Sequence, residues 1–332
     1  MKYFFLLFCL SISICCRAQT QETTYAEKLG YPKGARVLIL HVDDAGMSFD
    51  SNEGTIAAMT KGVATSCSVM MPCPWVPGFV HYLQEHKNLD AGLHLTLTSE
   101  WKDYRWGPLA GKSQVPGLTD LEGSMWHGVA DVVKHASADE VEKEIRAQID
   151  RAATVGFEPS HMDSHMGTLF ATPAFLERYV KVGIEKKIPV MLPGGHNTLI
   201  QSEMKAPNEQ MLQLRQLGKM LWSGGLPVLD DLHNESYDWK IPESMTNDDN
   251  KMRAFKTAKY IEAIKSLKPG VTMMIMHCTA TTEVFPYISN SGPVRKADLL
   301  AMTDPLLKDA LQKEGIILTT WRELKERRDK LK

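Results

Sequence analysis

The sequence predicts an α/β fold, built as a single (β/α) barrel of about seven strands. Apolar segments of strand length alternate with helical segments some seven or eight times along the chain, which is typical of parallel strands with helical crossovers. No change in composition marks a domain boundary within residues 19–332. Polar side chains recur where the predicted strands end, and in such barrels this is the face that carries the chemistry.

Residues 1–18 have the pattern of a secretory signal peptide. Lys2 precedes an apolar run that ends at Cys16 and is too short for a permanent membrane span, and Ala18 is a small residue suited to cleavage. A lipoprotein anchor at Cys15 or Cys16 is the alternative, although the residues before these cysteines are not the small ones expected there. We therefore expect export to the periplasm or the medium.

Composition narrows the range of functions. The formal net charge of -2 gives no sign of nucleic-acid binding or of a membrane-surface role, and no later stretch is long enough to span a bilayer. Three cysteines remain after the predicted cleavage: Cys67, Cys73 and Cys278. Their odd number and irregular spacing argue against a disulfide framework, although a single disulfide bond is left as an alternative. We expect them as small buried hydrophobes. A homodimer is left open beside a monomer.

The first predicted strand, Arg36–Val42, is almost continuously apolar, as expected for a parallel strand covered on both faces. Asp43 and Asp44 follow it directly. Two adjacent carboxylates raise each other's pKa, so the pair is costly unless a cation or hydrogen-bond donors satisfy it. Turn and helix-entry chemistry is the alternative, but a turn seldom needs two aspartates.

The remaining elements alternate along the chain. The loop at 100–136 is long enough to be a lid or a binding loop, and its aromatic residues either stack on sugar rings or pack the loop onto the barrel. In order, we expect a helix capped by Ser51 or Asn52, strand 64–71, helix 76–85, strand 89–98, the inserted loop 100–136, a helix from a capping box at 137–140 to Gly156, helix 173–186, strand 188–192, helix 208–222, strand 227–229, helix 249–267, strand 271–276, helix 296–313, strand 315–320 and helix 321–329.

Histidines follow several of these strands. His161, Asp163 and His165 alternate within one short segment and would point the same way if that segment is extended. A cation site explains such a row better than an apolar core does, while a solvated turn rich in histidine is the alternative. His94 lies inside strand 89–98 and His277 follows strand 271–276. Because strand ends share one face of a parallel barrel, we expect these groups and the two aspartates to converge.

Three motifs carry a resemblance to a known family. Asp43-Asp44-Ala-Gly-Met-Ser, Gly92-Leu-His-Leu-Thr-Leu-Thr and His161-Met-Asp-Ser-His, in this order, resemble the YdjC-like carbohydrate deacetylases. That family includes chitooligosaccharide and diacetylchitobiose deacetylases and is distantly related to polysaccharide deacetylases. The resemblance extends from Arg36 to the region of Leu324.

The resemblance implies a distorted (β/α) barrel that binds one divalent cation. It places Asp44, His94 and His165 on the metal and makes Asp43 the general base. Mg²⁺ or Zn²⁺ is expected first, and nitrogen and oxygen ligands also admit Mn²⁺ or Co²⁺. The chain departs from the family pattern after His165, where Met166-Gly-Thr-Leu replaces further histidines, and at His277-Cys-Thr, which replaces His-Pro-Gly.

The chemistry of acetamide hydrolysis fits these residues. A cation on two imidazoles and a carboxylate activates water and stabilises an oxyanion. Asp43 would take the water's proton, and His277 or His161 could return one to the departing amine. We expect Asp163 to hydrogen-bond a ligand histidine. Which of the two adjacent aspartates faces the ion stays open.

The sequence thus predicts an exported, metal-dependent hydrolase that removes an acetyl group from an N-acetylated amino sugar or oligosaccharide. An exported, non-catalytic carbohydrate-binding protein on the same fold is the main alternative. Non-haem iron oxygenases also use two histidines and a carboxylate, but the alternation of strands and helices argues against their usual antiparallel sheets.

Overall fold

The computed structural model describes residues 23–331, so the predicted signal peptide lies outside the described residues. The chain folds around a curled parallel sheet of seven strands, with the order β4-β3-β2-β1-β6-β5 and with β7 paired to β1. The prediction of an α/β fold with about seven parallel strands is confirmed. The strands are β1 (Arg36–Ala45), β2 (Ser66–Val69), β3 (Ala91–Leu95), β4 (Met162–Ser164), β5 (Asp231–His233), β6 (Gly270–Met276) and β7 (Ile317–Leu318).

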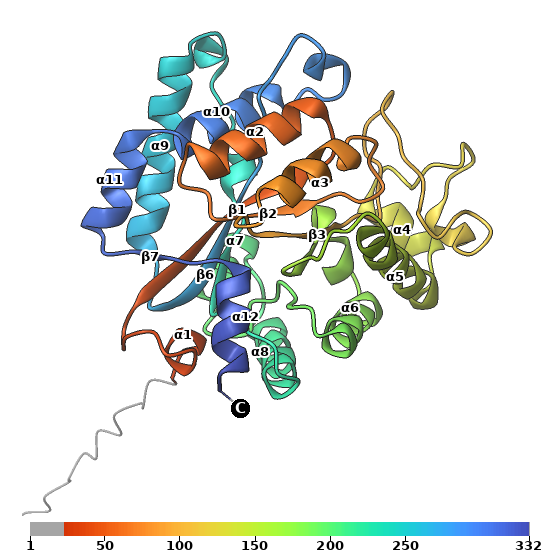
Figure 1. Cartoon of the computed structure of the whole chain (residues 1–332), viewed down its shortest axis with the longest axis horizontal. Helices are drawn as coiled ribbons and strands as arrows, with labels where there is room; N and C mark the ends of the chain where they lie inside the picture. The colour runs from red at the N-terminus through yellow and green to blue at the C-terminus, as the bar shows by residue number, and fades with distance from the viewer. Residues whose placement is uncertain (1–22, 332) are drawn as a thin grey trace, which may run out of the picture.

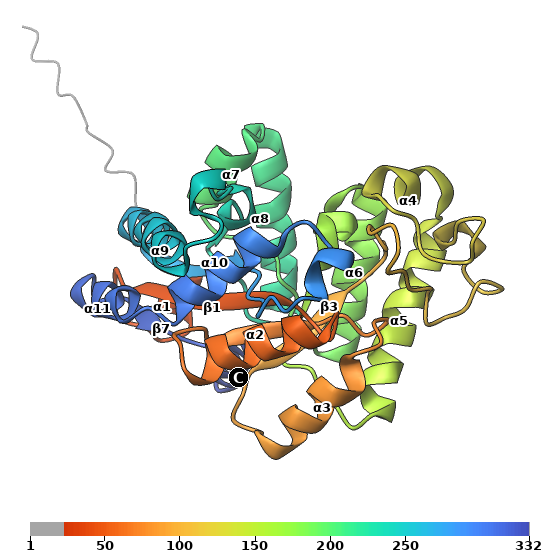
Figure 2. The same cartoon turned by 90° about the horizontal axis from the view of Figure 1, so that it is seen from above.

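Helices cover the sheet on its outer side (Figures 1 and 2). α9 packs against α10 and α11, α10 also contacts α2, and α5 and α6 lie side by side near β3. The α-helices are α1 (Tyr25–Lys28), α2 (Phe49–Thr60), α3 (Val76–Glu85), α4 (Val129–His135), α5 (Ala138–Thr154), α6 (Pro173–Lys186), α7 (Thr198–Met204), α8 (Asn208–Ser223), α9 (Asp249–Ser266), α10 (Gly292–Met302), α11 (Pro305–Lys313) and α12 (Trp321–Asp329), and the 3₁₀ turns are η1 (Pro116–Leu118), η2 (His165–Phe170), η3 (Ser236–Asp238), η4 (Glu243–Met245) and η5 (Phe285–Tyr287).

Two predicted helices differ from the observed ones. The helix expected over 296–313 is divided into α10 and α11, because Pro305 cannot continue a helix and Asp304 caps the next one by accepting the Leu306 N–H. The cap of α2 is Ser48, whose hydroxyl accepts the Ser51 N–H at 3.1 Å, and not Ser51 or Asn52. The capping box that opens α5 is present as predicted.

The strand expected over 188–192 is reduced to single parallel bridges. Val190 pairs with Met162 and Pro193 pairs with Leu229. Pro189 lies within this segment and Pro193 follows it, and because proline has no N–H neither can donate to a longer ladder. These bridges lie between the two ends of the strand order and continue the curl of the sheet from β4 toward β5.

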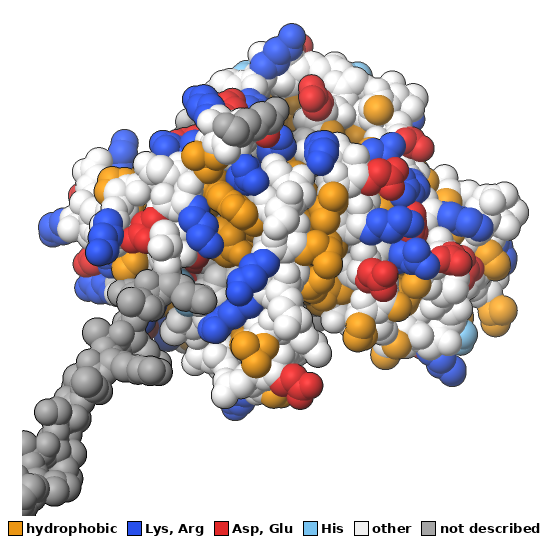
Figure 3. All heavy atoms as spheres, turned by 90° about the horizontal axis from the view of Figure 1, so that it is seen from below, with side chains coloured by type: hydrophobic (Ala, Val, Ile, Leu, Met, Phe, Trp, Pro, Cys, Tyr) orange, Lys and Arg blue, Asp and Glu red, His pale blue; other side chains and the backbone are white. Residues whose placement is uncertain are grey.

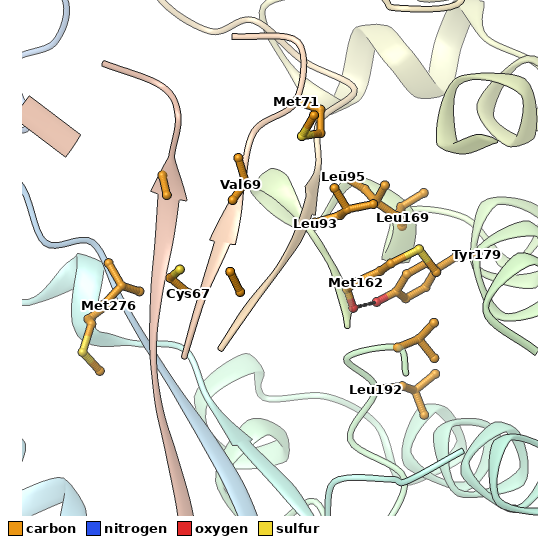
Figure 4. Close-up of a cluster of buried hydrophobic side chains, with 14 of the residues drawn as sticks. Cys67, Val69, Met71, Leu93, Leu95, Met162, Leu169, Tyr179, Leu192 and Met276 are labelled. Atoms are coloured by element: carbon orange, nitrogen blue, oxygen red, sulfur yellow. Dashed lines mark hydrogen bonds between the residues drawn. The ribbon is translucent and has the colours of Figure 1, made fainter. Parts of the chain in front are cut away.

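Close to β4, the core is built from apolar side chains of the sheet and of α6. Leu93 and Leu95 of β3 are fully buried beside Met162, and the Tyr179 hydroxyl donates a hydrogen bond to the Met162 carbonyl at 2.6 Å (Figure 4). The hydroxyl is thereby satisfied inside an apolar cluster, where an unpaired one would be costly. This packing holds β4, and with it the residues that follow at its carboxyl end.

The strand predicted over 227–229 is observed a little later, as β5, and the buried Asp230 lies directly before it. Its carboxylate accepts the N–H groups of Tyr25, Ala26 and Val271 at 2.8, 3.0 and 2.8 Å. Asp230 therefore connects α1 to the amino-terminal end of β6.

Asp230→Ala should lower the free energy of unfolding by about 3 kcal/mol, because it leaves several buried N–H groups without an acceptor. Urea unfolding followed by circular dichroism would measure the change. Asp230→Asn, which keeps one carbonyl acceptor, should lose less. A loss below about 1 kcal/mol for Asp230→Ala would contradict this role.

The segment at 100–136 contains η1 and α4 and is held down by its aromatic residues. Trp106 is only 4% exposed and packs in a cluster with Met47 and Phe285. The Trp126 indole donates to the Gly117 carbonyl at 2.8 Å. Trp106 therefore packs the loop onto the barrel, whereas the Trp126 hydrogen bond ties two parts of the loop together.

The surface and the cysteines agree with the composition. Basic and acidic side chains are interspersed over the face seen from below, with apolar side chains in narrow strips (Figure 3). Cys67, Cys73 and Cys278 are free and buried, as predicted, and burial raises the pKa of each thiol. Within residues 23–331, no helix combines the length and apolar character that crossing a bilayer requires.

Candidate active site

A backbone irregularity at the end of β1 brings two consecutive aspartates to one site. The pairing of β1 with β2 shifts register between Val42 and Ala45, and Asp44 adopts a positive φ of 68°. Neighbouring side chains on a regular strand point to opposite faces, whereas a bulge can turn both to the same side. Asp43 Oδ2 and Asp44 Oδ1 accordingly lie 3.8 and 3.3 Å from the same atom, His94 Nε2. A positive φ is unusual for a residue other than glycine and is most often kept at functional sites.

Three buried ligand atoms converge beside this bulge. Asp44 Oδ1, His94 Nε2 and His165 Nδ1 lie 3.2–3.4 Å from one another, and Asp44 Oδ1 has no hydrogen-bond partner within residues 23–331. Nitrogen and oxygen atoms at about 2.0–2.2 Å from one ion would be about 3–3.5 Å apart. The donor set therefore fits a single divalent cation, and it consists of the three residues that the family resemblance implied.

Asp163 contacts the His94 ring on the nitrogen that is not one of the three ligand atoms. Its Oδ1 lies 2.6 Å from His94 Nδ1, so it hydrogen-bonds that histidine as expected, and its Oδ2 lies 2.9 Å from His41 Nε2. Burial alone would raise the pKa of Asp163, but His94, His161 and His41 outweigh it and hold the pKa well below the usual range. Asp163 is therefore a carboxylate that fixes the orientation of the His94 ring.

Two charged residues that sequence reasoning missed complete the surroundings. Arg295 of α10 is buried and donates to Asp44 Oδ2 at 2.6 Å. The Glu100 carboxylate lies 3.0 Å from His165 Nε2. Glu100 directly follows the polar end of the predicted strand 89–98, which could have drawn attention to it. Arg295 lies in a helix far along the chain, and no sequence pattern marked it.

Asp43 and His277 stand together beside the three ligand atoms. Asp43 Oδ2 is 4.0 Å from His277 Nε2, and the His277 side chain is 16% exposed. The His277 N–H donates to Asp298 Oδ2 at 3.1 Å, which fixes the backbone at the end of β6. Burial lowers the pKa of His277. A carboxylate and an imidazole are thus available next to the candidate cation site for proton transfer.

His161 approaches Asp163 and not the three ligand atoms. It is fully buried, stacks on Trp321 with ring centroids 5.1 Å apart, and its Nδ1 pairs with the Ser160 hydroxyl at 3.0 Å. The predicted row forms only in part: His161 and Asp163 point the same way, but β4 ends at Ser164 and His165 begins η2, in which Met166 has a φ of 51°. His165 turns toward Asp44, while His161 stays below Asp163, with its Nε2 3.7 Å from Asp163 Oδ2.

His41 is a further residue that the sequence analysis did not single out. Its Nε2 lies 2.9 Å from Asp163 Oδ2, 3.1 Å from the Ser68 hydroxyl and 3.2 Å from Asp43 Oδ1. Burial lowers its pKa, but the hydrogen bonds to Asp163 and Asp43 outweigh burial and raise the pKa to about 9. His41 Nε2 therefore lies within 3.2 Å of both carboxylates and joins them. Its position two residues before Asp43 in an apolar strand was the available signal.

Comparisons with known proteins identify the family and the fold of this chain. The family description "YdjC-like protein" matches residues 37–313. The chain is 29% identical over 300 residues to a carbohydrate deacetylase of Thermus thermophilus, covering 90% of this chain and 97% of the relative, and 35% identical over 156 residues to one of Brevibacillus brevis, covering 47% and 59%. A solved structure from Enterococcus faecalis, described as a candidate cellobiose-phosphate cleavage protein, has the same fold, with a TM-score of 0.69 at 20% identity over 87% of this chain and 99% of that one. The chain belongs to the YdjC-like protein family.

Proposed function

We propose that this protein is a metal-dependent carbohydrate deacetylase that hydrolyses the N-acetyl group of an amino sugar or oligosaccharide. The observation that carries the proposal is the convergence of Asp44 Oδ1, His94 Nε2 and His165 Nδ1 within 3.2–3.4 Å of one another, next to Asp43. Relatives named carbohydrate deacetylases, one of them aligned over 90% of the chain, support the substrate class.

Asp44, His94 and His165 would hold the cation. When bound, such an ion lowers the pKa of water and stabilises the negative charge that develops on the acetyl oxygen. Arg295 holds Asp44 Oδ2 at 2.6 Å and so leaves Oδ1 directed at the two histidines. We expect Mg²⁺ or Zn²⁺, since the Asp44 carboxylate suits both ions and the two imidazole nitrogens suit Zn²⁺.

Asp43 is the general base in this proposal, and His277 is the general acid. Asp43 would take the proton of the attacking water, and His277 would give a proton to the departing amine nitrogen. The 4.0 Å separation of Asp43 Oδ2 and His277 Nε2 allows both to reach one substrate. His161, the other acid considered, is fully buried against Trp321 and has no comparable access.

Two alternatives have less support. A non-catalytic sugar-binding protein would not need a base and an acid placed beside a cation site. Iron oxygenases with two histidines and a carboxylate usually use antiparallel sheets, whereas the strands here pair in parallel. We further propose that the reaction takes place outside the cytoplasm, on the basis of the signal-peptide pattern in residues 1–18.

Chelation should test the proposal directly. Protein treated with EDTA is expected to stop releasing acetate from N-acetylglucosamine and its β-1,4-linked oligomers, and reloading with Zn²⁺ or Mg²⁺ should restore release. The acetate is measured enzymatically, alongside elemental analysis of the purified protein. His81→Ala, at an exposed histidine in α3, is the matched control and should behave like the parent. Metal-loaded protein that releases no acetate from N- or O-acetylated sugars would exclude this function.

A further inference from the structure

An exposed aromatic ring stands directly beside the candidate acid. Tyr237, in η3 just after β5, is 38% exposed, and its ring centroid lies 4.8 Å from that of His277. The Arg295 guanidinium carbon lies 5.4 Å from the Tyr237 ring and 6.0 Å from the Trp101 ring. Two aromatic rings thus adjoin the arginine that holds Asp44, at the carboxyl ends of the strands.

The turn that carries this exposed ring is firmly anchored. The Ser236 hydroxyl donates to a β6 carbonyl, and Lys256 Nζ donates to the Ser236 carbonyl at 2.7 Å. Lys256 is fully buried and pairs with Asp298 at 3.0 Å, and Asp298 also accepts the His277 N–H. One buried ion pair therefore fixes both the turn under Tyr237 and the backbone of His277. A ring held this way loses little conformational freedom when a ligand packs on it.

We propose that Tyr237, which shares the Arg295 guanidinium with Trp101, is the platform of a sugar-binding subsite. The C–H face of a pyranose ring would pack on the Tyr237 ring, and the acetamide on that sugar would point toward His277 and Asp43. Aromatic faces carry negative partial charge and attract C–H groups, while the hydroxyl edge of the sugar stays in water. The proposal rests on the function proposed above and adds that the pyranose ring is recognised, not only the acetyl group.

The bland alternative is that Tyr237 only shields the Arg295 guanidinium by a cation–π contact. The two roles differ in what a substitution changes. A shielding role affects the stability of the fold and depends little on the sugar. A platform role affects the affinity for the sugar and requires a flat ring, but not the hydroxyl.

These two roles can be distinguished by measuring the affinity for the sugar in a variant that cannot hydrolyse it. The binding of the β-1,4-linked N-acetylglucosamine dimer would be measured by isothermal titration calorimetry in an Asp43→Asn background. Tyr237→Ala and Tyr237→Leu are each expected to raise the dissociation constant about tenfold, and Tyr237→Phe is expected to raise it by less than about threefold. Tyr82→Ala is the matched control. The Tyr82 ring also lies against a histidine, with the ring centroids of Tyr82 and His86 3.9 Å apart, but this pair is at the carboxyl-terminal end of α3. The control variant should bind like the parent.

Thermal unfolding of each variant reports on the shielding role independently. Unchanged affinity in both Tyr237→Ala and Tyr237→Leu would overturn the subsite, as would a loss in Tyr237→Phe equal to that in Tyr237→Ala. Absence of any dimer binding in the parent background would also overturn it. Failure of the deacetylase function is read separately, as absence of acetate release by the protein with Asp43 intact, and it leaves the binding result standing.

Discussion

His165→Ala is expected to remove most of the bound metal and to lower kcat/KM for acetate release by at least about 10³-fold. His165 Nδ1 is one of only three buried ligand atoms that meet at the candidate cation site in the described chain. An alanine there leaves two ligands, and a two-ligand site competes poorly with water for a divalent ion. Metal content by mass spectrometry and acetate release from the N-acetylglucosamine dimer would be measured on the same samples.

Glu100→Gln provides a graded comparison for that variant. Glu100 lies 3.0 Å from His165 Nε2 and does not reach the ligand atoms, so its loss should weaken metal binding by about 10- to 100-fold. His81→Ala, at an exposed histidine, should retain the parent values. If His165→Ala kept its full metal content and its rate, the assignment of His165 as a ligand would be wrong.

Asp43→Asn is expected to lower kcat by about 10²- to 10⁴-fold while the metal content stays unchanged. Asp43 is not one of the three converging ligand atoms, and its Oδ2 lies 4.0 Å from His277 Nε2, so its proposed role is proton transfer. Asparagine keeps the shape of the side chain but cannot take a proton. Steady-state kinetics and elemental analysis would separate loss of the base from loss of the ion.

Asp44→Asn is the paired variant, and it should lose metal and activity together. It also removes the negative partner of the buried Arg295, so its unfolding temperature is expected to fall further than that of Asp43→Asn. The two aspartates are adjacent, and the sequence left open which of them faces the ion. The assignment would be reversed if Asp43→Asn lost the metal and Asp44→Asn kept it.

Local patterns predicted the elements well wherever a segment's own chemistry was sufficient. α3, α6 and α12 have the predicted bounds, because proline, capping residues and apolar spacing define them locally. The single helix expected over 296–313 was wrong, since Pro305 was given too little weight. The strand over 188–192 was overestimated in the same way, because Pro189 within it and Pro193 after it limit pairing.

The candidate site was predictable only in part. Asp43, Asp44 and His277 could be found because each falls at a predicted strand end, and His94 because it lies near one; parallel strands bring these ends to one face. His161 could not be separated from His165 by pattern, because the difference depends on where β4 ends and η2 begins. Side chains alternate between two faces only in the extended segment, and that segment ends at Ser164.

By itself, the sequence determined the alternation of strands and helices, the polarity of the sheet and the residue types that reach its carboxyl end, because these depend on periodicity and short motifs. Only the tertiary structure decided that Arg295 pairs with Asp44, that Tyr237 stands beside His277 and that His161 lies apart. Arg295 and Asp44 are 251 residues apart in the sequence. Contacts over such separations are set by how helices pack around the curled sheet, and no local pattern records that packing.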